Sequence, residues 1–103
     1  MLEEFLTRNG TLCCLQLQEV HLSNLFDIYY ELDLIVEEFL PTEIQLNLQD
    51  IQKVNSTAIG RLVYLKRYVQ EEKMLKFSIQ GINPQTLKTL KSVKVDGVLE
   101  IGS

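Results

Sequence analysis

The apolar residues follow two different periods in turn along the chain, and this alternation limits the fold more than any other feature. Residues 43–48, EIQLNL, place Ile44, Leu46 and Leu48 at every second position, which predicts a strand with one buried face. After a polar stretch, the period changes to three and four residues. This second stripe predicts a helix that ends near Glu72, and its members are Ala58, Leu62, Leu65 and Val69, flanked by Ile59 and Val63.

The same alternation occurs earlier in the chain. Residues 11–20, TLCCLQLQEV, predict a strand at 12–17 that starts the sheet, with a turn into a second short strand near His21 as an extension. A helix follows, with Asn24 and Asp27 as a capping pair and Pro41 as its stop. The buried stripe predicted for this helix consists of Leu25, Ile28, Leu32, Ile35 and Phe39.

The C-terminal third continues the pattern. Residues 75–79 predict a strand, Asn83-Pro84 predicts the start of a short helix, and residues 98–101 predict a last strand. The fold class is therefore α/β: a single domain over residues 1–103, with its core at about 11–101. We expect a central, mostly parallel or mixed sheet of four to five strands with helices packed alongside.

Composition excludes several classes of protein. A chain of 103 residues is long enough for one modest core, and 46% hydrophobic with 23% charged residues is typical of a globular domain. A net charge of −4 and scattered basic residues argue against nucleic-acid binding. No apolar run approaches the roughly 20 residues of a membrane span, and the N-terminus lacks the basic start of a signal peptide. We expect a cytoplasmic protein without direct membrane insertion.

The residues that usually carry chemistry are few. Cys13 and Cys14 are neighbours, so on a strand they point to opposite faces and match neither a redox nor a metal spacing. His21 is the only histidine and has no cysteine or histidine cluster around it. The sequence also lacks a nucleophile elbow and a glycine-rich phosphate loop. We therefore expect no enzyme activity, catalytic residue, metal or cofactor.

Residues 45–62, QLNLQDIQKVNSTAIGRL, resemble a known family. The sulfate transporter and anti-sigma factor antagonist domain, or STAS domain, has an alternating strand, a short turn, and then Asp-Ser-Ser/Thr-Gly-Leu-Gly at the start of a helix. The corresponding stretch here is NSTAIG, residues 55–60, and the order of elements agrees from about Thr11 to Ile101. Asn47 and Asn55 stand where the family usually has aspartates, and Ala58 replaces the first glycine.

The resemblance implies a stand-alone anti-sigma factor antagonist, or anti-anti-sigma factor. Such a protein is a phosphorylation-controlled switch that regulates transcription by binding an anti-sigma factor, which is also a serine kinase. Ser56 falls on the serine that the kinase modifies, and Thr57 is the second candidate. The alternative is a STAS subunit that docks on a membrane transporter or lipid-transport ATPase without phosphorylation. A small-ligand site at the turn is a third reading, with no sequence feature of its own.

From the residues alone, small polar residues before a helix are most often caps. One side chain is enough for capping, so Asn55 is the expected cap and Ser56 is left near solvent. On the same helix, Thr57, Arg61, Tyr64 and Tyr68 share one face away from the buried stripe. Tyrosine and arginine are common at binding hot spots, although tyrosines also pack against neighbouring elements. The predicted partner-binding residues are Asn55, Ser56, Thr57, Arg61, Tyr64 and Tyr68.

Overall fold

A four-stranded mixed sheet forms the middle of the molecule, in the order β1-β2-β3-β4. The structure is a computed structural model that describes residues 2–101. β1 pairs antiparallel with β2, whereas β2 with β3 and β3 with β4 are parallel. The strands are β1 Leu6–Asn9, β2 Leu12–Gln16, β3 Glu43–Leu48 and β4 Lys76–Ile82.

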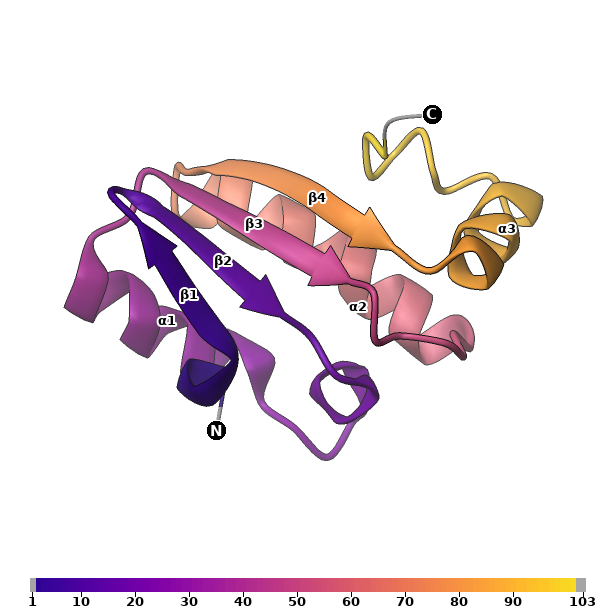
Figure 1. Cartoon of the computed structure of the whole chain (residues 1–103), viewed down its shortest axis with the longest axis horizontal. Helices are drawn as coiled ribbons and strands as arrows, with labels where there is room; N and C mark the ends of the chain where they lie inside the picture. Colours follow the sequence, from indigo (N-terminus) through magenta and orange to yellow (C-terminus); the bar gives the residue numbers. More distant parts are fainter. Residues whose placement is uncertain (1, 102–103) are drawn as a thin grey trace.

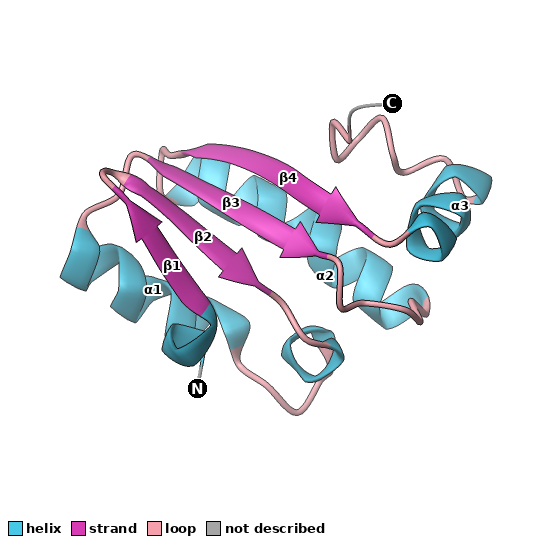
Figure 2. Ribbon diagram, in the orientation of Figure 1, coloured by secondary structure: helices cyan, strands magenta, loops and turns pink. Residues whose placement is uncertain are grey.

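Two helices cover one face of this sheet (Figure 1). They are α1, Ile28–Phe39, and α2, Ser56–Arg67, which continues as the π-helical segment η3, Tyr68–Glu72. The short helix α3, Pro84–Ser92, lies beyond the end of β4, and within residues 2–101 no helix covers the opposite face of the sheet (Figure 2). Two 3₁₀ helices, η1 Leu2–Phe5 and η2 Glu19–Leu22, complete the helical elements. Within residues 2–101, no helix has the length and apolar character needed to cross a membrane.

The core lies between the sheet and the helix layer, as the two hydrophobic periods predict. Ile44, Leu46 and Leu48 on β3 are each 0% exposed, which confirms the predicted register. The predicted stripe of α2 is buried over the same sheet, from Ala58 to Val69. Each fully buried aliphatic side chain contributes about 1.5–3 kcal/mol to folding, so these two elements fix the position of the segment between them.

The start of α1 differs from the prediction. Leu25 is 95% exposed and does not belong to the buried stripe. The helix begins at Ile28, and the cap is Asp27, whose carboxylate accepts a hydrogen bond from the amide of Tyr30 at 3.1 Å. Phe26 takes the inward position instead, because its ring packs edge-on against His21. The predicted pairing of Asn24 with Asp27 as caps was therefore wrong.

Two predicted strands are absent from residues 2–101. The segment near His21 is the 3₁₀ helix η2, residues 98–100 form a turn, and Ile101 is in no regular element. The backbone amides of Leu99 and Ile101 bond locally, to the carbonyls of Val95 and Asp96, so they are not offered to a neighbouring strand. Leu99 is still buried. Conversely, the edge strand β1 was not predicted, so residues 12–17 do not start the sheet.

Candidate functional site

The loop between β3 and α2 is held by polar side chains at each end. Asn47 accepts a hydrogen bond from the amide of Gln49 through its side-chain oxygen, at 2.8 Å. Gly81, with a positive φ of 79°, lies against this side chain, and a Cβ there would come within 2.9 Å of the Asn47 oxygen. Only glycine fits both the backbone angle and the space. Asn47 therefore has a structural role at the end of β3.

The middle of the loop is anchored from two other elements. The Glu19 carboxylate on η2 accepts hydrogen bonds from the amides of Gln52, at 3.1 Å, and Lys53, at 3.4 Å. On the other side, the buried Thr86 hydroxyl of α3 donates to the carbonyl of Ile51. These contacts satisfy backbone groups that lie outside the regular elements, so the loop has a defined conformation.

Asn55 caps α2, as predicted. Its side-chain oxygen accepts a hydrogen bond from the amide of Ala58 at 2.9 Å. Ser56 and Thr57 are exposed, and neither hydroxyl has a hydrogen-bond partner within residues 2–101. The free amides and the positive end of the helix dipole make this position favourable for an anion. Two hydroxyls are thus open to solvent at a helix start that is already capped.

A groove of about 600 Å³ runs beside this helix start. A second hollow of about 380 Å³ adjoins it, since Asn24 lines both, and the exposed Leu25 belongs to the second. The first groove is lined by Glu19, Leu22, Ser23, Asn24, Lys53, Val54, Asn55, Thr57 and Ala58. Its walls therefore combine the β3–α2 loop with the turn before α1, two segments that are distant in sequence.

The flank of α2 faces α1. Arg61 donates to the side-chain oxygen of Asn24 at 3.3 Å, and its guanidinium lies 5.8 Å from the centre of the Tyr29 ring. The Tyr64 ring meets Tyr29 edge-on at 5.4 Å but remains 58% exposed. Arg61 is half-buried. The predicted binding face is therefore partly occupied by contacts with α1 and the turn before it.

Tyr68 is more deeply engaged than Tyr64. Its hydroxyl donates to Asp33 on α1 at 2.5 Å, and Lys73 forms an ion pair with the same carboxylate at 2.7 Å. Burial alone would raise the pKa of Asp33, but the hydrogen bonds from Lys73 and Tyr68 and the lysine charge lower it. Burial and the bond to Asp33 raise the pKa of Tyr68. Thus Tyr68 joins α1 to η3, and its ring also packs on Tyr29.

His21, Cys13 and Cys14 do not line the groove at α2. His21 is buried, accepts a hydrogen bond from the amide of Gln18 through Nδ1 at 2.9 Å, and sits between the rings of Phe5 and Phe26. Burial lowers its pKa. Cys13 faces the core, and Cys14 lies on the open face, where its thiol donates to the Gln45 side chain. The predicted opposite orientation is confirmed.

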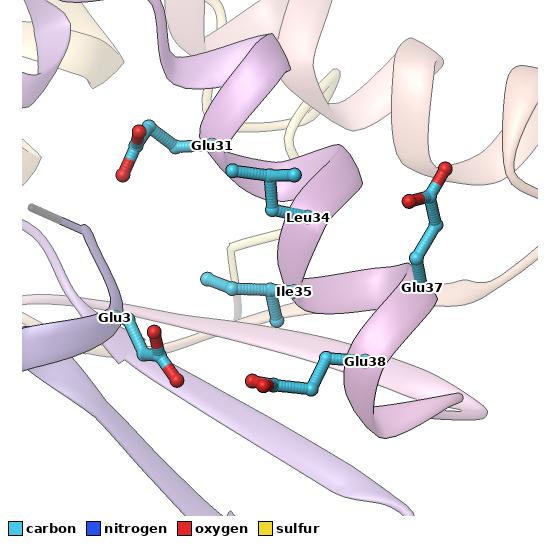
Figure 3. Close-up of a pocket in the computed structure, with 6 residues that line it drawn as sticks. All are labelled: Glu3, Glu31, Leu34, Ile35, Glu37 and Glu38. Atoms are coloured by element: carbon cyan, nitrogen blue, oxygen red, sulfur yellow. The ribbon is translucent and has the colours of Figure 1, made fainter.

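A separate hollow of about 510 Å³ is strongly acidic (Figure 3). Glu3 and Glu38 turn toward each other across it, and their hydrogen bond and mutual repulsion raise the pKa of Glu3. The remaining lining residues are Glu31, Leu34, Ile35 and Glu37. No group of three potential metal ligands with suitable geometry occurs within residues 2–101. This hollow lies between η1 and α1 and shares no residue with the groove at α2.

The structure thus places Asn55 and Thr57 at one groove, while Ser56 is exposed between them and does not line it. Arg61 lines the adjoining hollow, and Tyr64 lies farther along α2 beside Tyr68, which is bound to α1. Sequence reasoning missed Glu19, Asn24 and Leu25. Glu19 contacts residues more than 30 positions away, and no local pattern signals such a contact. Leu25 fitted the helical period by spacing alone, and only its exposure assigns it to the surface.

No protein-family model and no curated protein matches the chain. A similar solved structure is described as the NMR structure of the protein TM1081. It is 17% identical to this chain, the match covers 100% of this chain and 81% of that one, and the TM-score is 0.73. At this level of identity the similarity shows the fold alone.

Proposed function

We propose that the protein is a STAS-type anti-sigma factor antagonist, a cytoplasmic protein-binding switch controlled by phosphorylation. The observation that carries the proposal is the start of α2, where Asn55 caps the helix and leaves the Ser56 and Thr57 hydroxyls exposed, with no hydrogen-bond partner among the described residues. A purely structural cap needs one of these three side chains. The resemblance of NSTAIG to the family signature supplies the partner, an anti-sigma factor that is also a serine kinase.

The electrostatics of this helix start explain how such a switch works. A phosphate on Ser56 adds a charge of about −1.5 to −2, and the free amides and the helix dipole stabilise it. The domain therefore stays folded after modification. A partner that covers the same groove has to desolvate the phosphate, and a buried charge without a counter-ion is strongly unfavourable. The unmodified protein binds the partner, and the modified one releases it.

The partner surface includes more than the signature residues. The groove beside Asn55 and Thr57 is concave, and the exposed Leu25 lines the hollow that adjoins it. Tyr64 is a second large exposed side chain, two turns along α2 from Thr57. Exposed apolar and aromatic anchors around a concave surface are typical of binding sites. Arg61 holds the turn before α1 in place through Asn24 and belongs to the same surface.

Kinase treatment tests this proposal directly. The protein is incubated with the anti-sigma kinase that co-purifies with it and with ATP, and phosphate is located by mass spectrometry. We expect one phosphate on Ser56, none at that position in Ser56→Ala, and retained partner binding by Ser56→Ala. Ser56→Asp is expected to lose partner affinity while keeping its melting temperature, because its carboxylate lies near the helix N-terminus.

The alternative, a subunit that docks without phosphorylation, has one structural observation in its favour. Asn47 and Asn55 are neutral, and both amides already hold backbone groups of the loop and helix. If a kinase requires the missing negative charge, Asn55→Asp will be phosphorylated faster than the wild type. If neither protein accepts phosphate from a kinase that binds it, the docking function replaces the switch.

A further inference from the structure

The segment 19–27 is tied to the signature region at two points. Glu19 holds the amides of Gln52 and Lys53, and Asn24 accepts a hydrogen bond from Arg61 on α2. The other hydrogen bonds of the turn after η2 are local, for example from the amide of Leu25 to the Ser23 hydroxyl. Within residues 2–101, these are the hydrogen bonds that join this segment to the loop and to α2.

Both ties involve charged groups close to Thr57. Glu19, Asn24 and Thr57 line the same groove. Arg61 follows Thr57 by four residues, so the two side chains are neighbours on one face of the helix. An anion at position 57 therefore repels the Glu19 carboxylate and attracts the Arg61 guanidinium. The repulsion weakens the hydrogen bonds of Glu19 to the loop amides. The attraction weakens the hydrogen bond of Arg61 to Asn24.

We propose that segment 19–27 is a latch that a phosphate on Thr57 opens. This inference rests on the proposed function and concerns a second phosphate, on Thr57, in addition to the one expected on Ser56. Of the two charges, the one on Thr57 changes the conformation of the site. In the modification, the Thr57 oxygen forms a bond to the γ-phosphorus of ATP, the hydroxyl proton passes to a base of the kinase, and ADP leaves. The resulting dianion pairs with Arg61, and the turn that carries Leu25 is released.

Ser56 provides a matched control within the same helix turn. It is exposed like Thr57, but it does not line the groove. The residue four positions after it is Gly60, which has no side chain to pair with an anion. A charge on Ser56 therefore acts on a partner from outside, whereas a charge on Thr57 also acts on the shape of the groove.

Amide hydrogen exchange on the free protein tests the latch without any partner or kinase. We compare Thr57→Glu with Ser56→Glu, reading the amides of residues 19–27 and of Gln52 and Lys53. Thr57→Glu is expected to exchange about three to ten times faster at these amides, the factor that one lost hydrogen bond gives. Ser56→Glu is expected to match the wild type. Equal exchange in the two variants overturns the proposal.

Arg61→Ala gives a second test that introduces no charge at the helix start. It removes the tie to Asn24, so residues 23–25 are expected to exchange faster, while the Glu19 contacts with Gln52 and Lys53 stay protected. Unchanged exchange at residues 23–25 shows that Arg61 does not hold the turn and overturns the latch. The outcome is separate from the proposed function, because failure of the kinase assay leaves these exchange rates as they are.

Discussion

His21 illustrates how a single buried side chain depends on pH. The ring accepts a hydrogen bond through Nδ1, so this nitrogen carries no proton in the folded protein. Burial lowers the pKa below its ordinary value of 6.5, while the nearby Glu31 carboxylate opposes this shift. In the window between the folded pKa and 6.5, the unfolded chain binds the proton more readily.

We predict that the folding stability contributed by neutral His21 is fully present above pH 6.5 and is lost as the pH falls through the folded pKa. Because His21 is the only histidine, NMR titration of its imidazole signal measures the pKa directly. The midpoint is expected below 6.5, and His21→Asn, which keeps an acceptor for Gln18 but does not titrate, should reduce the pH dependence of the melting temperature in this window. A midpoint at or above 6.5 contradicts this prediction.

At the scale of elements, helix α1 is joined to η3, the continuation of α2, by Tyr68, Asp33 and Lys73. Tyr68→Phe removes the hydroxyl that donates to Asp33, so we predict a loss of about 0.5–1.5 kcal/mol in the free energy of unfolding. Chemical denaturation measures this change. Tyr64→Phe is the matched control, because the Tyr64 hydroxyl has no hydrogen-bond partner within residues 2–101, and its effect should be near zero. If both variants lost the same free energy of unfolding, the hydrogen bond from Tyr68 to Asp33 would not stabilise the fold.

The same contact has a pH dependence of known sign. The lowered pKa of Asp33 means that its contribution is present above its ordinary value of 3.8 and is lost as the pH falls through the folded pKa. The raised pKa of Lys73, caused mainly by its hydrogen bond to Asp33, acts in the opposite direction. That contribution is present below 10.5 and is lost as the pH rises through the folded value.

At the scale of the whole molecule, substitutions of exposed apolar residues near the groove should change partner binding and leave folding stability almost unchanged. We predict that Leu25→Ala and Tyr64→Ala each weaken partner binding by about 1 kcal/mol or more, with little change in melting temperature, because both side chains are largely exposed. Calorimetry with the co-purified partner measures the affinity. Tyr68→Ala should instead lower the melting temperature, since Tyr68 packs on α1. Intact binding by both exposed-site variants would place the partner surface elsewhere.

Much of the fold was predictable because local periodicity and tertiary burial agree. The alternation in residues 43–48 and the stripe from Ala58 to Val69 each specify which face is buried. The cap at Asn55 and the helix start at Asn83-Pro84 follow from hydrogen-bonding groups within three residues. Of the candidate site, the signature residues were found in this way, whereas its second wall, Glu19 to Leu25, was not.

The sequence by itself determined β3, α2 and the Asn55 cap of α2, since each depends on groups that are close along the chain. Only the tertiary structure decided the position of the turn at residues 23–27, the conformation of residues 98–101 and the partners of Glu19 and Tyr68. Short apolar runs fit a strand or a turn equally well, and the choice depends on whether a neighbouring strand or the local backbone receives the amides. Contacts such as Tyr68 with Asp33 join residues 35 positions apart, so they exist only after the helices have packed on the sheet.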